Sequence, residues 1–170
     1  MANIYKIHNG PAPTTAAQAT VTTGTSIKTM LQIKLNATAP KGVISAWGIS
    51  FDGSAAATPI KVELIETGTV FATVTAHVAA GIVKTGDPDA ANPTTTIFDV
   101  GTTSTGFTST SEGSISASRV FDAELVAPTN QYVMQFPLGR EPKLNNSTSI
   151  RIRVTAGAAV NCYCWIEIDI

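Results

Sequence analysis

The feature that most constrains this chain is a strict alternation of apolar and polar residues near its C-terminus. Between Ala159 and Ile168, every second residue is apolar: the row is Val160, Cys162, Cys164, Ile166 and Ile168. Successive side chains of a β-strand point to opposite faces of its sheet, whereas a helix would distribute this row around its circumference. The period of two therefore predicts a strand with one face in a hydrophobic core.

Similar patterns recur along the chain, separated by glycine, proline and asparagine turn signals. We expect further strands at residues 3–7, 26–35, 43–51, 60–64, 70–78, 95–100, 114–117, 120–126, 131–136 and 150–155. The segment 26–35 is ambiguous, because Ile27, Met30, Leu31 and Lys34 also fit a helical period. The 25 threonines, 16 isoleucines and 13 valines of the chain suit a pleated surface better than a helix.

Many short strands joined by irregular connections predict an all-β fold built as a two-sheet antiparallel sandwich. We favour jelly-roll connectivity over an immunoglobulin-like sandwich. At 170 residues, the chain is expected to form a single domain, 1–170. Residues 10–25 contain almost no large apolar side chain, which predicts an extended N-terminal arm or a surface loop.

The low charge and the short apolar runs of the chain argue against several classes of partner. Only 14% of the residues are charged and the net charge is −1, so we expect no nucleic-acid partner, because that binding requires clustered Lys and Arg. No apolar run approaches the length of a membrane-spanning helix, and we expect no membrane partner. The N-terminus has no basic segment followed by an apolar stretch, which predicts synthesis in the cytoplasm without a signal peptide.

The sequence offers little material for catalysis or for a metal site. His8 and His77 are the only histidines, and neither adjoins a nucleophile elbow. Cys162 and Cys164 are interpreted as small buried residues, because neighbours on one face of a strand strain disulfide geometry. The acidic residues of the strands are expected to be solvated: Glu63, Glu66, Asp122 and Glu124. We therefore predict a protein that is not an enzyme and has no cofactor and no metal.

Several residues are candidates for contact with a partner. Trp47 is in phase with apolar residues and is assigned to the core, whereas Tyr163 and Trp165 lie opposite the cysteine row and lie either in a core or on a contact surface. The loop around Arg140 is bracketed by prolines and is either solvated or in polar contact with a partner. The predicted contact residues are Pro11, Pro13, Gln18, Arg140, Glu141, Lys143, Tyr163 and Trp165.

Particular stretches of the chain resemble a known group of proteins. They are GPAPTTAAQ at 10–18, WGISFDGSAAA at 47–57, VELIE at 62–66, ATVTAH at 72–77, APTNQYV at 127–133 and QFPLGREP at 135–142. Over nearly its whole length, the chain resembles small β-rich virion structural proteins of tailed bacteriophages and prophages. No functional residue is carried over from these proteins.

The resemblance implies a decoration or cement protein on the outside of a phage capsid, which binds the major capsid protein. It also implies a homotrimer or another closed homo-oligomer, and a jelly-roll fold. A cement protein adds buried surface at junctions between shell subunits and so stabilises the shell by mass action. The alternative is a tail or head-fibre module in which Tyr163 and Trp165 bind a host glycan; a capsid-forming subunit is a third possibility.

Overall fold

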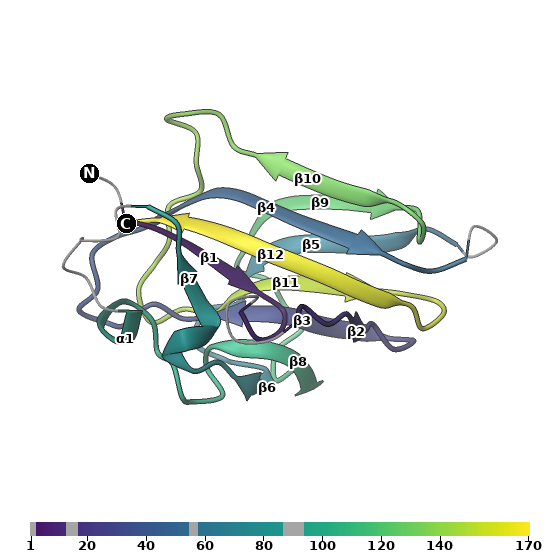
Figure 1. Cartoon of the computed structure of the whole chain (residues 1–170), viewed down its shortest axis with the longest axis horizontal. Coiled ribbons are helices and arrows are strands. Elements are labelled where there is room, and N and C mark those ends of the chain that lie inside the picture. The colour runs from purple at the N-terminus through teal and green to yellow at the C-terminus, as the bar shows by residue number, and fades with distance from the viewer. Residues whose placement is uncertain (1–2, 13–16, 55–57, 87–93) are drawn as a thin grey trace.

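The chain folds into two antiparallel β-sheets that pack face to face as a sandwich (Figure 1). This computed structural model describes residues 3–12, 17–54, 58–86 and 94–170. The strands are β1 Ile4–His8, β2 Val21–Thr22, β3 Ile27–Ile33, β4 Val43–Phe51, β5 Ile60–Glu66, β6 Thr73–Ala76, β7 Ile82–Lys84, β8 Gly106–Ser111, β9 Arg119–Val126, β10 Gln131–Gln135, β11 Ile150–Thr155 and β12 Asn161–Asp169. The helices are the 3-10 turn η1 Ala79–Gly81 and the short α1 Thr94–Ile97.

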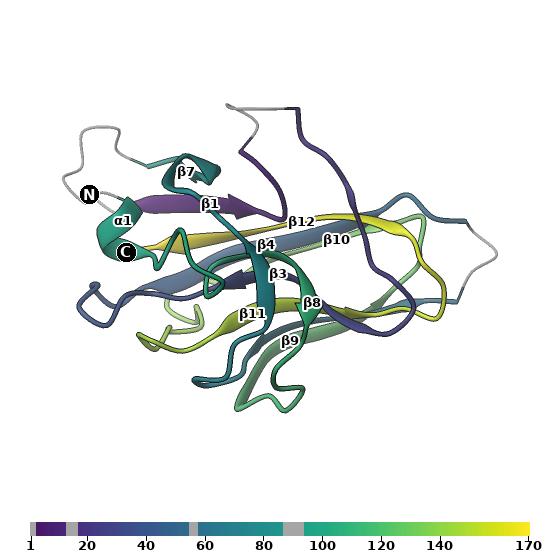
Figure 2. The same cartoon turned by 90° about the horizontal axis from the view of Figure 1, so that it is seen from below.

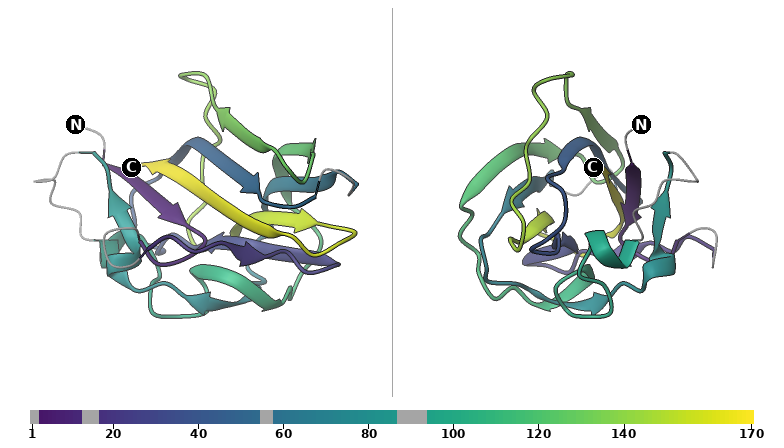
Figure 3. Two further views of the ribbon diagram at one scale, coloured as in Figure 1. Left: turned by 45° about the vertical axis from the view of Figure 1, so that its right-hand side comes forward. Right: turned by 90° about the vertical axis from the view of Figure 1, so that its left-hand side faces the viewer.

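Strands from distant parts of the sequence lie side by side in both sheets. Sheet A has the order β10-β4-β12-β1-β7, and β2 pairs with the start of β12. Sheet B has the order β6-β8-β3-β11-β5-β9. Figure 3 shows the two layers from the side and from one end. The all-β sandwich expected from the alternation is therefore confirmed.

The core lies between the sheets and is built from the predicted apolar rows. Tyr5, Trp47 and the two cysteines of β12 are fully buried there, and the cysteines are free thiols. A bulge at Ser45 shifts the register of β4, since Glu167 faces Ala46 but Ile168 faces Ile44. Ile44 and Trp47 consequently both reach the core, which a strict period of two does not predict.

The predicted strand at 26–35 is observed as β3, so its helical alternative is wrong. A register shift against β11 lies in this strand, because Ile152 faces Leu31 whereas Arg153 faces Thr29. The intervening Met30 is buried next to Leu31, which produces the helix-like spacing.

Two predicted strands are wrong. Residues 95–100 begin in α1 instead, where Asn36 Nδ2 donates hydrogen bonds to the carbonyls of Thr95, Thr96 and Phe98. Ile97 and Phe98 are buried at the end of the sandwich, and this packing outweighs the strand preference of threonine. Residues 114–117 form no strand, and the predicted strand at 70–78 is limited to β6.

The outer face of sheet B is covered over β11 by the chain itself. Arg151 is fully buried there, and its Nη1 donates to the carbonyls of Glu112 at 2.8 Å and Ser114 at 3.1 Å. Arg153 donates to the carbonyl of Ile115 at 2.7 Å. We call residues 70–72 and 112–115 the covering segments. They explain the missing strand at 114–117, since these carbonyls accept hydrogen bonds from arginines and not from a neighbouring strand.

The prediction that Glu63 and Glu66 are solvated is wrong. Glu63 is buried and accepts a hydrogen bond from Arg153 Nε at 3.1 Å. Burial alone would raise the pKa of Glu63, but the bonds and charges of Lys61 and Arg153 outweigh it and lower that pKa. Glu66 is buried at the end of β5 and is paired with Arg119. Each buried carboxylate thus has a cationic partner.

The predicted N-terminal arm, residues 10–25, is not confirmed as a detached segment, because its described residues Ala12 and Thr23 are buried. Its described residues leave the end of β1 and return at β2 (Figure 2). Thr23 is buried, and its backbone N–H donates to the carbonyl of Val160 at 2.8 Å. The C-terminal part of the segment therefore belongs to sheet A, and contact of the remainder with another subunit stays a prediction.

Candidate binding face

The outer face of sheet A over β10, β4 and β12 carries three rows of side chains, and we call it the open face. The central row runs from Val133 through Gly48 and Trp165 to His8. The flanking rows are Gln131, Ser50 and Tyr163 on one side, and Gln135, Ala46, Glu167 and Lys6 on the other. The open face thus has apolar and aromatic side chains at its centre and mainly polar ones at its rim.

Gly48 shapes the centre of the open face. A Cβ atom at this position would lie 2.9 Å from three atoms of the Trp165 indole, so the ring occupies the space that a side chain would fill. Lys6 Nζ lies 3.8 Å from the centroid of the Trp165 ring in a cation–π contact. The indole is held between strand β4 and a lysine, and it is half-buried. Val133, which faces Gly48 from β10, is 56% exposed.

Tyr163 is held in place by a pair of histidines that the sequence separates widely. The rings of Tyr163 and His8 are stacked at 5.6 Å, and the Tyr163 hydroxyl lies 2.6 Å from His8 Nδ1. His77 Nε2 lies 2.8 Å from the carbonyl oxygen of His8. His77 itself is buried beside Phe107.

Both histidines favour the neutral state. Burial lowers the pKa of His8 below its ordinary value, and the charge of Lys6 adds to this effect. Burial also lowers the pKa of His77, although its hydrogen bond to the carbonyl of His8 opposes the shift. A neutral His8 imidazole can accept a hydrogen bond from the Tyr163 hydroxyl at Nδ1, which agrees with the lowered pKa of His8.

The structure brings four of the predicted contact residues to sheet A near the open face. Tyr163 and Trp165 lie on the open face itself. Pro11 follows the end of β1, and Gln18 lies next to Gly10 on the returning part of the segment. Pro13 lies outside the described residues.

The other three predicted contact residues lie in a separate turn. Arg140, Glu141 and Lys143 follow β10, and Lys143 forms an isolated bridge with Val43 at the start of β4. Their neighbour Leu138 was not predicted as a contact residue, yet it is 97% exposed. Val133, Gly48 and Lys6 were also missed, because only the pairing of β10, β4, β12 and β1 places them beside Trp165.

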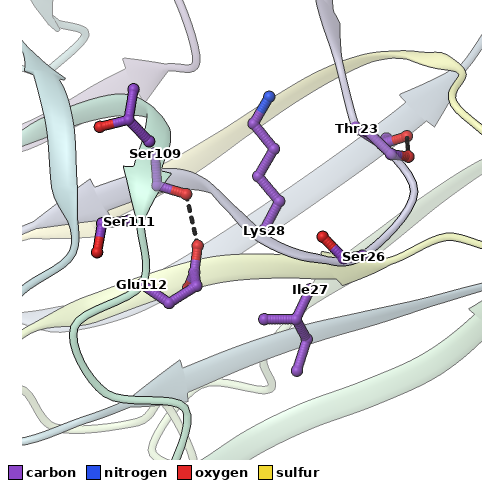
Figure 4. A pocket seen from close by; sticks show the side chains of 9 residues that line it. Thr23, Ser26, Ile27, Lys28, Ser109, Ser111 and Glu112 are labelled. Atoms are coloured by element: carbon purple, nitrogen blue, oxygen red, sulfur yellow. Dashed lines mark hydrogen bonds between the residues drawn. The ribbon is translucent and has the colours of Figure 1, made fainter.

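The described residues contain neither an evident catalytic group nor a metal site. No group of three or more His, Cys, Asp or Glu side chains among them could hold a metal ion. A hollow of about 160 Å³ lies between β3 and β8 (Figure 4). Its only carboxylate, Glu112, already accepts hydrogen bonds from Ser109 and from the N–H and hydroxyl of Thr29. The polar groups of this hollow hold β3, β8 and a covering segment together.

Comparison with known proteins gives no relative on which to base a function. No protein-family model, curated protein or solved structure matches the chain. No helix in the described part of the chain is long and apolar enough to cross a membrane.

Proposed function

We propose that this protein is a non-enzymatic structural component of a phage virion that decorates and stabilises the capsid by binding the major capsid protein. The open face carries the proposal. Protein-binding surfaces typically have aromatic and apolar side chains at the centre and polar groups at the rim. Val133, Trp165 and Tyr163 provide such a centre, surrounded by Gln131, Gln135 and Glu167.

The rigidity of the open face supports binding to a preformed surface such as a capsid shell. Trp165 is held by Gly48 and Lys6, and Tyr163 is held by His8. Aromatic side chains that are already ordered lose little conformational freedom on binding, so more of their contact energy appears as affinity. The predicted contact residues Pro11 and Gln18, on the segment between β1 and β2, would extend this contact surface.

The strand order supports a jelly-roll connectivity, which we also propose. When β2, β6, β7 and β8 are set aside, eight strands remain. Their orders in the two sheets are β1-β12-β4-β10 and β3-β11-β5-β9. The chain changes sheets at every connection between these strands except the one from β5 to β9. Two four-stranded sheets linked in this way are the arrangement that interlocked Greek keys produce.

The glycan-binding alternative finds less support in the geometry of the same rings. A sugar stacks on a free aromatic face, but Lys6 Nζ lies over the Trp165 ring and His8 stacks on Tyr163. A sugar would have to displace these contacts. A protein partner can cover the rings edge-on together with Val133 and the polar rim.

Binding to capsid shells tests the proposal. Shells of the encoding phage that lack this protein are mixed with the purified chain, sedimented, and heated with and without it. We expect co-sedimentation and a higher disruption temperature. Val133→Asp and Trp165→Ala should abolish binding, whereas Val78→Asp, at an equally exposed valine away from the open face, should retain it. No binding by the unaltered chain, or density for the chain only in the tail, would refute the proposal.

A further inference from the structure

The turn around Leu138 is an apolar projection held firmly at its base. Arg140 N–H donates to the carbonyl of Pro137 at 2.8 Å, and Gly139 supplies the positive φ of 83° that the turn requires. Phe136 N–H donates to the carbonyl of Ser45 at 2.9 Å on one side of the turn. On the other side, Ile44 N–H donates to the carbonyl of Pro142 at 3.0 Å.

This projection exposes almost the whole Leu138 side chain to water. An ordered turn loses little entropy when it binds, and an apolar side chain at its tip gains from being covered. Arg140 and Glu141, one of each charge, follow the leucine after Gly139.

A groove with apolar and charged lining residues lies on the edge of sheet B, near the end of β9. It has a volume of about 360 Å³ and is lined by Lys61, Ala123, Glu124 and Leu125. Leu125 is 70% exposed and faces Lys61 across the strand pair. Val120, also exposed, continues the same outer row of β9. The groove therefore combines an apolar wall with one positive and one negative rim residue.

We propose that the Leu138 turn of one copy of this chain binds in the Leu125 groove of a second copy, and that repetition of this contact closes a ring. The charges are complementary: Arg140 can pair with Glu124, and Glu141 with Lys61, which is 52% exposed although it also pairs with Glu63. Because turn and groove are different surfaces, the contact is head-to-tail, and such contacts form closed rings when the rotation between copies permits.

Direct pairing of two β9 edges is a poorer explanation of the exposed leucines. In a twofold antiparallel pairing centred on Asp122 or on Ala123, Asp122 would face Asp122 or Glu124, respectively, of the other strand. A bulge at Phe121 also interrupts the strand, as the register shift against β5 shows. Bulges and like charges are devices that protect edge strands from pairing.

Complementation between two defective variants tests the proposal. Analytical ultracentrifugation should show a closed oligomer for the unaltered chain. Leu138→Asp removes the apolar side chain of the turn, and Leu125→Asp removes the apolar wall of the groove. Each should weaken self-association by about 30-fold or more. Because each variant retains the surface that the other lacks, their mixture should form a heterodimer with one intact contact.

Controls separate this inference from misfolding and from capsid binding. Far-UV circular dichroism should show the same β-rich spectrum for both variants as for the unaltered chain, since both leucines are exposed. Val78→Asp should retain the oligomer, as should Val133→Asp, which tests the open face. A monomeric unaltered chain, or variants that do not complement each other, would overturn the proposal. If Leu125→Asp abolished capsid binding of a monomeric chain, the groove would belong to the capsid protein and the proposal would also fail.

Discussion

The outer faces of the two sheets differ in what covers them. On sheet B, the buried Arg151 and Arg153 donate hydrogen bonds to the covering segments, so that this polar face is closed by the chain itself. On sheet A, Trp165 and Tyr163 are held only by single side chains, and Val133 remains exposed. Polar groups that already form hydrogen bonds within the chain are not available to a partner. The outer face of sheet B is therefore closed over β11 by the chain itself, whereas the outer face of sheet A is left exposed at Val133.

The largest expected change in stability comes from removing the hydrogen bonds between sheet B and its covering segments. Arg151→Ala should lower the free energy of unfolding by about 3–5 kcal/mol, because Glu112 and several buried carbonyls lose their partner. Chemical denaturation measures this loss. Lys41→Ala, at an exposed lysine outside the proposed contact surfaces, is the control and should change stability by less than about 0.5 kcal/mol. Equal effects of the two substitutions would mean that the cover contributes no stability.

The two faces should also lose stability in different pH ranges. The pKa values of His8 and His77 lie below 6.5 in the folded chain, so their contribution is complete above pH 6.5 and is lost as the pH falls through the folded pKa values. The pKa of Glu63 lies below 4.5, so its contribution is present above pH 4.5 and is lost in more acidic solution. Stability should therefore fall in two steps on acidification.

Denaturation curves recorded between neutral and acidic pH measure these steps. His8→Asn should flatten the upper step, and Glu63→Gln should flatten the lower one. Removal of the same step by both variants would show that the two faces do not titrate independently.

A smaller effect is expected at Gly48. Gly48→Ala places a methyl group where the Trp165 indole lies and should move the ring into solvent. We expect a destabilisation of about 1 kcal/mol and a stronger quenching of tryptophan fluorescence by iodide. Trp47 is fully buried and serves as an internal control, because its emission should not change. Unchanged quenching would show that Trp165 does not depend on the glycine.

The smallest effect concerns the lysine over the indole. Lys6→Met retains the aliphatic stem and removes the charge, so stability should fall by about 0.5–1 kcal/mol through the lost cation–π contact. The same change should lower the melting temperature slightly and move the emission of Trp165. An effect as large as that of Arg151→Ala would contradict the view that this single contact contributes little to the stability of the fold.

Strands with clear alternation were predicted well, and those that depend on partners were not. Residues 43–51 and 150–155 were predicted with the observed bounds, because apolar side chains recur along them at nearly every second position. The strand β8 has the sequence GFTSTS and was missed, since its side chains show no apolar period. It forms because β3 and β6 flank it and bond to its backbone. Backbone pairing of this kind leaves little trace in the side chains.

The candidate site was predicted in part for a similar reason. Tyr163 and Trp165 were selected because they alternate with the cysteines, a relation within one strand. Gly48, Val133 and Lys6 lie 117, 32 and 159 residues away from Trp165 in the sequence and meet it only through strand pairing. The burial of Glu63 was missed because its partner Arg153 lies on a different strand.

The sequence by itself determined that the chain is all-β and which face of most long strands enters the core. Those properties follow from local alternation, because side chains at even and odd positions of a strand point to opposite faces. The tertiary structure alone decided which outer face is covered and which remains open. That choice depends on hydrogen bonds and contacts between residues far apart in the sequence, such as Arg151 with Glu112 and Trp165 with Gly48.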